Sequence, residues 1–214
     1  MSDIFREIEE ELRRDNFLKL WQRYGKYVIA AAVVVVVAAA VIVGWRQYSL
    51  HQRQAEGVRY GAALALATQG KSKEAAQAFA AMSPDLSSGR AVLARFEEAA
   101  LKAKNGDGEG ALALYQSLAA DGANPAIYRD LARLLAARLT LIKDPKSALV
   151  QLKPLTDPAN PWHASALELT AVGALEDGDK AAARKTYQQL ADDLNAPAGL
   201  RARAAEMVAA LAQQ

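Results

Sequence analysis

The stretch GDGEGALALYQSL, residues 106–118, contains the pattern that decides the fold. Its residues Ala111, Tyr115 and Leu118 stand at offsets of zero, four and seven. These offsets place all three side chains on one face of an α-helix. The small alanine lets a neighbouring helix approach closely, and the bulky tyrosine fills the space beside it. The stretch therefore predicts a helix with one buried face.

The same pattern occurs four times along the chain, because residues 70–82, 143–155 and 178–190 repeat it. The alanines that open the four copies lie 36, 37 and 35 residues apart. A fixed period of this length is the mark of a repeat architecture. The residues that carry the repeat-core signature are Ala75, Phe79, Ala111, Tyr115, Leu118, Ala148, Leu152, Ala183, Tyr187 and Leu190.

The segments around each copy predict helical hairpins. The turn before a copy carries Gly-Asp or Lys-Asp, which can end one helix and start the next. A link with proline follows each copy, at Pro84, Pro125, Pro158 with Pro161, and Pro197. Apolar-periodic segments at 91–104, 126–142, 163–176 and 200–212 are predicted to be the first helices of the pairs. We expect an all-α fold in which these hairpins stack as an α-solenoid.

A second pattern, from Tyr27 to Trp45, predicts a transmembrane helix. No residue in it is charged, and nineteen residues of helix cover roughly 28 Å, close to the thickness of a bilayer core. It contains eight valines and two isoleucines, which favour insertion into lipid. Aromatic residues bracket it, with Trp21 and Tyr24 before and Tyr48 after, as at membrane interfaces.

A cleaved signal peptide is the main alternative for this segment. The apolar block is longer than the core of a usual signal peptide, and a long tail with six acidic and six basic residues precedes it. The sequence Gly44-Trp45-Arg46 does not resemble a small-residue cleavage site. We therefore expect an uncleaved anchor.

Basic residues near the two ends of the segment predict its orientation. Five lie on the N-terminal side, between Arg13 and Lys26, and three lie on the other side, between Arg46 and Arg59. This bias favours a cytoplasmic N-terminus. In a bacterium with two membranes, residues 1–26 would form a cytoplasmic tail, residues 27–45 an inner-membrane span, and residues 46–214 a periplasmic repeat domain.

The tail itself has the pattern of an amphipathic helix. Apolar residues stand at positions 4, 5, 8 and 12, charged residues surround them, and Ser2 is a suitable N-cap. Two interpretations stay open. The helix could simply flank the anchor at the membrane surface, or it could dock a cytoplasmic partner.

The composition excludes several classes of function. A net charge of +2 over 214 residues gives no reason to expect a nucleic-acid partner. The chain has no cysteine, and its two histidines, His51 and His163, are predicted to be surface or capping residues. The paired acids 177 with 179 and 192 with 193 fit turns, and the glycines of 106–110 lack the lysine of a phosphate loop. We predict no catalytic residue, cofactor, metal or small-molecule substrate.

The repeat spacing, the Gly-Asp turn and the proline link resemble the tetratricopeptide repeat, whose period is about 34 residues. The full layout also resembles a bacterial family, the ancillary SecYEG translocon subunits. The likeness rests on the short charged tail, LWQRYG at residues 20–25, Gly44-Trp45-Arg46 after the span, and diverged repeats behind it. This resemblance implies contact with the Sec channel and with periplasmic chaperones or emerging chains.

These patterns favour a membrane-tethered adaptor that binds proteins, since a stacked-helix domain offers a concave binding surface. An anchor would raise the effective concentration of partners at the membrane. The alternative function is an envelope-sensing regulator whose cytoplasmic tail sequesters a signalling protein. An enzyme is a third class, for which the sequence offers no constellation of residues.

Overall fold

The computed structural model describes residues 2–85 and 88–213; for residues 2–17, 19, 20, 28, 31, 32, 85 and 88 it describes the backbone alone. All regular elements in the described residues are helices, which confirms the predicted all-α fold. In chain order they are α1 (Ser2–Thr68), α2 (Ser72–Met82), η1 (Ser83–Asp85), α3 (Ser88–Lys104), α4 (Gly108–Ala120), α5 (Ala126–Thr140), α6 (Pro145–Leu152), η2 (Lys153–Thr156), α7 (His163–Glu176), α8 (Lys180–Asp192) and α9 (Ala198–Ala212).

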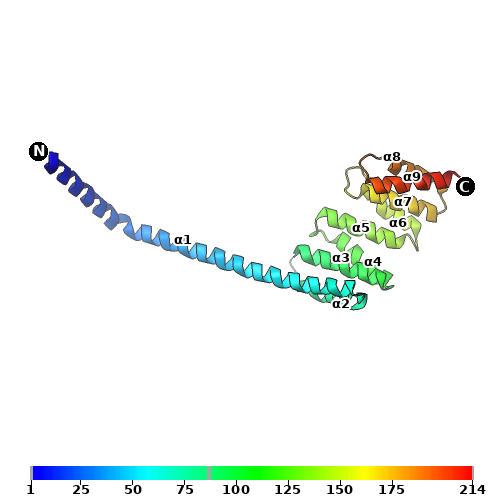
Figure 1. Cartoon of the computed structure of the whole chain (residues 1–214), viewed down its shortest axis with the longest axis horizontal. Coiled ribbons are helices and arrows are strands. Elements are labelled where there is room, and N and C mark those ends of the chain that lie inside the picture. Colours follow the sequence, from blue (N-terminus) through cyan, green and yellow to red (C-terminus); the bar gives the residue numbers. More distant parts are fainter. Residues whose placement is uncertain (1, 86–87, 214) are drawn as a thin grey trace. The chain divides into compact units, whose positions relative to one another are not determined.

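The chain divides into two units, Met1–Ala55 and Glu56–Gln214. The first unit consists of the N-terminal part of α1. The second unit contains the end of α1 and all the later helices, which stack in chain order (Figure 1). The predicted tail is helical, but the side chains that would make it amphipathic lie outside the described residues.

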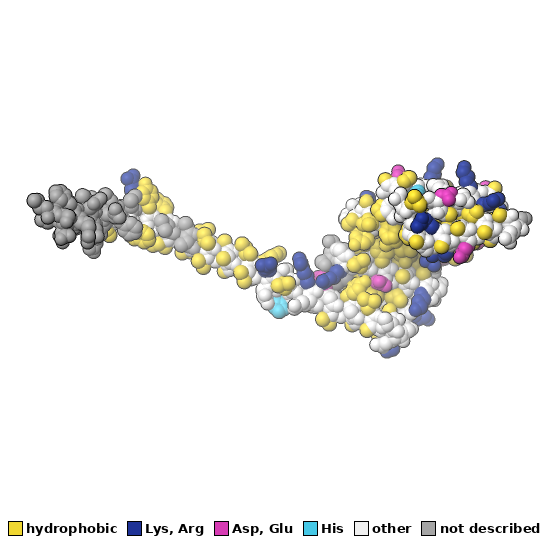
Figure 2. Space-filling view, turned by 45° about the horizontal axis from the view of Figure 1, so that its top comes forward, with side chains coloured by type: hydrophobic (Ala, Val, Ile, Leu, Met, Phe, Trp, Pro, Cys, Tyr) yellow, Lys and Arg dark blue, Asp and Glu magenta, His cyan; other side chains and the backbone are white. Residues whose placement is uncertain are grey.

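In the first unit, α1 carries a long apolar stretch whose described valines and isoleucines are exposed. The described valines between Val33 and Val43 are 55–67% exposed. Among the described residues, the part of α1 from Val33 to Thr68 is long and apolar enough to cross a membrane, and an 18-residue window within it has a mean hydropathy of 1.8. The predicted span, residues 27–45, overlaps this helix. Figure 2 shows hydrophobic atoms along much of the stretch.

In the second unit, the second helix of each hairpin packs between the first helix of its own hairpin and the helix that follows it in the chain. Helix α2 shares a core with the end of α1 and with α3, and α4 shares one with α3 and α5. Helix α6 lies in the same way between α5 and α7, and α8 lies between α7 and α9. Because each hairpin contacts only its neighbours, the unit is an α-solenoid.

The repeat-core signature residues form the centres of these cores. The opening alanines of the four copies, Ala75, Ala111, Ala148 and Ala183, are 0% exposed. The bulky residues four positions later are also buried; they are Phe79, Tyr115, Leu152 and Tyr187. The small residue therefore sits where two helices meet, and the large one fills the volume beside it.

Three of the four hairpin turns contain a glycine in the left-handed region. Gly70, Gly106 and Gly178 have φ of 80°, 88° and 85°. In each turn the next residue donates its backbone N–H to a carbonyl five residues back, as Asp107 does to Lys102 at 2.9 Å. This is the Schellman arrangement, which satisfies the last carbonyls of a helix and favours glycine because it has no Cβ.

Aspartates then begin three of the following helices. The side chains of Asp107, Asp144 and Asp179 accept hydrogen bonds from backbone N–H groups three residues later, at 2.8–3.0 Å. These bonds satisfy donors that a helix start leaves without partners. The glycine of the Gly-Asp turn thus ends one helix, and the aspartate begins the next, as predicted.

The predicted first helices correspond to α3, α5, α7 and α9, with ends that differ by no more than three residues. The third copy departs most from its predicted range. Helix α6 ends at Leu152 and continues as the short helix η2, which contains Pro154. Proline has no N–H to continue the α-helical ladder, so Leu155 enters the core from η2 instead.

Candidate functional site

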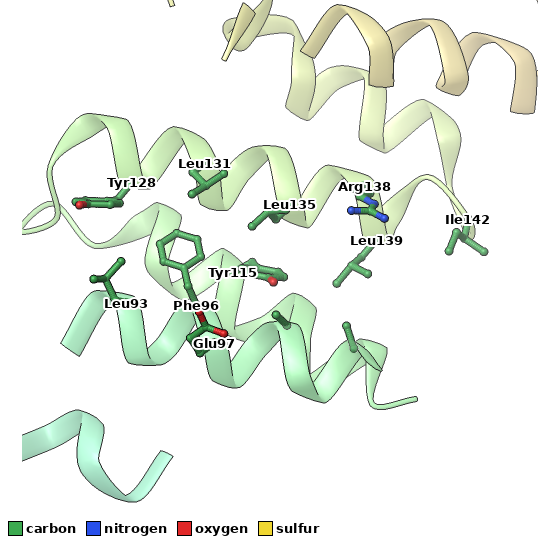
Figure 3. A pocket seen from close by; sticks show the side chains of 12 residues that line it. Leu93, Phe96, Glu97, Tyr115, Tyr128, Leu131, Leu135, Arg138, Leu139 and Ile142 are labelled. Carbon is green, nitrogen blue, oxygen red and sulfur yellow. The ribbon is translucent and has the colours of Figure 1, made fainter. Parts of the chain in front are cut away.

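A groove of about 560 Å³ opens between α3 and α5, and we name it the α3–α5 groove. Figure 3 shows the two helices as its walls, with Tyr115 of α4 between them. One wall consists of Leu93, Phe96, Glu97, Ala100 and Ala103 of α3. The other consists of Tyr128, Leu131, Leu135, Arg138, Leu139 and the following Ile142.

Helix geometry explains why these residues share a wall. On α3 the lining residues recur at intervals of three and four, which is one face of a helix. The neighbouring positions Val92 and Ala99 turn away into the core with α4. Helix α3 is therefore apolar on two faces, of which one is buried and the other lines the groove. The small side chains of Ala100 and Ala103 leave the groove open along this wall.

Aromatic rings provide much of its apolar surface. The ring of Phe96 lies 6.0 Å from that of Tyr115 and 6.4 Å from that of Tyr128, tilted by 43° and 49°. Rings at these distances and tilts attract each other and form a pre-shaped surface. Figure 2 shows hydrophobic side chains gathered in the middle of the repeat unit.

Three polar groups stand within this apolar surface. Glu97 lies on the α3 wall, Arg138 on the α5 wall, and the hydroxyl of Tyr115 between them (Figure 3). Burial raises the pKa of Tyr115, the charge of Glu97 raises this pKa further, and the charge of Arg138 lowers it. Both charges therefore act on the same phenol.

The groove continues around the end of α3. A second cleft, of about 410 Å³, shares Leu139 and Ile142 with it and extends over the turn at residues 106–109. Ile142 is 84% exposed, which is unusual for an isoleucine. An ion pair of 3.0 Å between Lys143 and Glu109 borders this cleft. The apolar surface is therefore longer than the groove alone.

A further cavity, of about 600 Å³, lies at the proline links beside His163. The Nδ1 atom of His163 lies 2.9 Å from the carbonyl oxygen of Thr156, and its Nε2 lies 3.9 Å from Oδ2 of Asp193. Asp193 also accepts the backbone N–H of Asn195 at 2.9 Å. These contacts join the links before α7 and α9, so the histidine has a structural role here.

The other residues weighed for chemistry also take local structural roles. His51 is exposed and its Nε2 lies 3.1 Å from the side-chain nitrogen of Gln47. Asp179 caps α8, and Asp192 accepts a hydrogen bond from Gln188 at 2.9 Å. In the part of the chain that the structure describes, no group of three acidic or histidine side chains is placed to hold a metal ion.

The repeat-core signature residues are buried in the cores, whereas most residues that line the groove lie outside the signature. Of the signature residues, Tyr115 alone also lines the groove. The signal was present in the segment 91–104, where Leu93 and Phe96 are bulky apolar residues away from the buried stripe. Large apolar residues on a second face of a helix indicate a second contact surface.

The fold and the groove define a helical repeat scaffold with an open inner surface. The chain belongs to the tetratricopeptide repeat-like domain family, which matches residues 19–208. The match begins before the apolar segment and so includes it. This confirms the tetratricopeptide-like part of the expected resemblance and indicates a protein-binding scaffold.

Solved structures show the same fold. Two structures from Podosopora anserina, described as a kinesin light chain with nearly identical TPR-like repeats, superpose with TM-scores of 0.55 and 0.54 at 17% identity. Each comparison covers 73% of this chain and 84% of the other. No curated protein matches the chain in sequence.

Proposed function

We propose that the protein is a membrane-tethered adaptor, an ancillary subunit of the Sec translocon that links it to periplasmic chaperones or emerging chains. The observation that carries the proposal is the open α3–α5 groove, whose walls are largely apolar although they face solvent. Monomeric proteins rarely expose such patches unless they bind something there. Concave surfaces of helical repeats are well suited to peptides and folded partners.

The tether is residues 27–45 of α1. The eight valines and two isoleucines of this segment, at roughly 0.3–0.6 kcal/mol each, favour insertion by about 3 to 6 kcal/mol. A helix satisfies its own backbone hydrogen bonds, so it can cross lipid as a single element. The exposed valines of this part of α1 fit a lipid environment better than water.

The orientation rests on the five basic residues before the span and the three after it. It can be tested directly because the natural chain has no cysteine. A cysteine at Ser2 should resist a membrane-impermeant maleimide in intact spheroplasts, and a cysteine at Ser117 should react. The opposite labelling pattern would reverse the assignment of the two compartments.

The translocon assignment rests on the resemblance in residues 20–25 and 44–46 together with the repeats behind the span. A photo-crosslinking residue at Leu93, in the groove, should capture a Sec component, a chaperone or an emerging chain. The matched control is Val150 on α6, which is as apolar and more exposed but lies outside the groove. Adducts can be identified by mass spectrometry from detergent-solubilised membranes.

The outcomes separate the parts of the proposal. Equal capture at Leu93 and Val150 would remove the groove as the binding surface. Reproducible adducts with a division or cell-wall factor alone would remove the translocon and leave the tethered adaptor. The regulator hypothesis is tested by deleting residues 2–20, since channel association should survive in an adaptor and a regulatory phenotype would vanish with the tail.

A further inference from the structure

Glu98 of α3 is a buried acidic residue whose carboxyl group has no bonding partner among the residues that the structure describes. It is 8% exposed, and no hydrogen bond or ion pair joins it to another described residue. Burial raises the pKa of its carboxyl group, and the charges of Lys102 and Arg95 oppose that shift. Both cations bond elsewhere. Lys102 donates to Asp107 at 3.2 Å. Arg95 donates to Ser117 at 2.7 Å. A buried carboxylate normally has a partner, because removing its charge from water is costly.

The repeat does not require a carboxyl group at this position. The residue 72 positions after Glu98, at the equivalent place beside α8, is Thr170. The hydroxyl of Thr170 donates to the carbonyl oxygen of Ala166 at 2.7 Å, within its own helix. This position can therefore hold a residue that satisfies its own polar group, whereas Glu98 keeps an unused acceptor.

Glu98 lines a cavity of about 280 Å³, which we name the Glu98 cavity. Ala94 and Leu101, on the same face of α3, pack with α2, so Glu98 also faces α2. Its neighbour Glu97 lines the α3–α5 groove instead. Two adjacent acids thus belong to two different surfaces of the protein.

The rest of the Glu98 cavity provides further acceptors and a short apolar wall. Gln77 of α2 and Asn105 in the turn after α3 line it, and among the described residues neither side-chain amide forms a hydrogen bond. Ala76 and Ala80 of α2 form the apolar part of the lining. Acceptor oxygens from two sides therefore border a space that can admit a narrow apolar chain.

We propose that the Glu98 cavity binds the side chain of an arginine that a protein partner inserts. The guanidinium group donates to the carboxylate of Glu98 and to the amide oxygens of Gln77 and Asn105. The methylene stem of the arginine lies along the two alanines of α2. The site is on a different face of α3 from the groove, and it does not depend on the function proposed above.

Other ligands fit this cavity less well. An anion would be repelled by Glu98, and in the described part of the chain no group of three acidic or histidine side chains is placed to hold a metal ion. The volume is below the usual range of pockets for whole small molecules, so it suits a single side chain. A guanidinium has five donors and is more weakly hydrated than an ammonium, which favours arginine over lysine. Asp107 balances the charge of Lys102, and water screens the exposed Lys73.

The test uses the full-length protein in nanodiscs, with a trifluoromethyl label on the variant Lys73→Cys. The natural chain has no cysteine, and Lys73 lines the cavity without being one of the proposed acceptors. The probe is Nα-acetyl-arginine methylamide, and its matched control is the neutral isostere Nα-acetyl-citrulline methylamide. Fluorine NMR shifts give the dissociation constants. The arginine compound should bind at least roughly tenfold more tightly, because only its head group is charged.

Two variants assign this binding to Glu98. Glu98→Gln keeps the size of the side chain and removes its charge, and should weaken the arginine compound roughly tenfold or more, the range for a hydrogen bond to a charged group. Glu97→Gln, the adjacent acid outside the cavity, is the control and should bind as the wild type does. The melting temperature of Glu98→Gln should not fall, since the change removes a buried charge without a partner. A purely structural role for Glu98 would lower it.

The source of the arginine is tested in membranes. A photo-crosslinking residue at Lys73 should capture a protein at a point close to one of its arginines, as located by mass spectrometry. The Glu98→Gln variant should lose this adduct. Tighter binding of propylguanidine, which has the same head group without a peptide backbone, would indicate a free small molecule instead of a protein.

Other results would also overturn the proposal. Equal binding of the arginine and citrulline compounds would remove the charge as the recognised feature. Unchanged affinity in Glu98→Gln would remove the residue, and capture at Lys73 that did not depend on Glu98 would remove the inserted arginine. Capture at Leu93 in the groove does not involve Glu98, so the adaptor function and the Glu98 cavity can each fail while the other stands.

Discussion

Two parts of the repeat unit share the same core residues but differ in the residues of their inner faces. The helices α3, α4 and α5 enclose the groove, while α7, α8 and α9 form the equivalent triplet further along. Tyr115 and Tyr187, Gly106 and Gly178, and Pro125 and Pro197 are all 72 residues apart, so the two triplets align without a gap. The residues that differ between them show how a repeat gains a binding surface while its core stays unchanged.

The cores of the two triplets are nearly the same. The pairs Ala99 with Ala171 and Ala132 with Ala204 are at most 1% exposed. The inner faces differ, because Val172 and Leu175 stand where the first triplet has Ala100 and Ala103. Both larger residues pack against the core of their triplet. Added volume on the first helix therefore accompanies the loss of open space.

Polar residues differ in the same way. Phe96 and Leu131 correspond to Glu168 and Arg203, which form an ion pair of 2.9 Å between α7 and α9. These two helices contact each other directly. In the first triplet Glu97 and Arg138 stand at other positions, facing the groove. One triplet thus uses its opposite charges to join two helices, and the other leaves them available to a ligand.

The largest expected effect tests the shared core. Tyr115→Ala and Tyr187→Ala should each lower the free energy of unfolding by on the order of 3 kcal/mol, because each leaves a cavity between three helices. Thermal unfolding of the full-length protein in detergent measures the loss. Gln116→Ala, an exposed neighbour on α4, is the control and should change stability by less than about 0.5 kcal/mol. If Tyr115→Ala melted at the wild-type temperature, Tyr115 would not stabilise its core as proposed, and the two cores would not be equivalent.

The next prediction transfers the inner face of one triplet to the other. The double variant Ala100→Val with Ala103→Leu should fill the groove and reduce partner capture by the photo-crosslinker at Leu93 by roughly tenfold or more, since the added side chains occupy its volume. Its melting temperature should fall only slightly, because Ala100 is exposed and Ala103 is only partly buried at the edge of the core with α4. Unchanged capture at Leu93 would mean that these two positions do not control access to the groove.

The repeat period in the sequence predicts the features that the two triplets share. The spacing of Ala111, Tyr115 and Leu118 sets which side of a helix is buried, and that is the same in every copy. The groove depends instead on residue size at positions such as 100 and 103, which the repeat pattern treats as interchangeable. Periodicity alone therefore could not distinguish an open triplet from a closed one.

The first hairpin shows a second limit of the sequence pattern. Its first helix is the end of α1, where Ala63 is buried and the ring of Tyr60 lies 5.2 Å from that of Phe79. No separate start of this helix can be recognised in the sequence, because no proline link or Gly-Asp turn stands between the apolar segment and Gly70. Prolines and Gly-Asp turns mark repeat boundaries in a sequence, so a helix that continues from the preceding segment without such a break carries no boundary signal.

A smaller effect concerns the caps, which the two triplets share. Asp107→Ala and Asp179→Ala should each lower the melting temperature at neutral pH, because each removes the acceptor for a backbone N–H at the start of a helix. The bond from Gly110, with help from Lys102, lowers the pKa of Asp107. Stability from this carboxylate is present above its unfolded pKa and is lost as pH falls through the lowered folded value. The difference between wild type and Asp107→Ala should therefore shrink in acid, as a pH series of melting curves would measure.

The smallest effect concerns Glu98, a buried carboxyl between α2 and α3 whose counterpart 72 residues later is Thr170. Burial raises the pKa of Glu98, and the nearby charges of Lys102 and Arg95 oppose that shift in part. A raised folded pKa means that the charged form costs stability once pH exceeds that value, whereas below the unfolded pKa the cost is absent. Glu98→Gln should therefore stabilise the protein at pH 7 by roughly a few tenths of a kcal/mol, a small value because water still reaches the carboxyl through the adjacent cavity. The gain should disappear when the same melting curves are recorded in acid, and a gain that persisted there would show that packing, rather than charge, separates Glu98 from its counterpart.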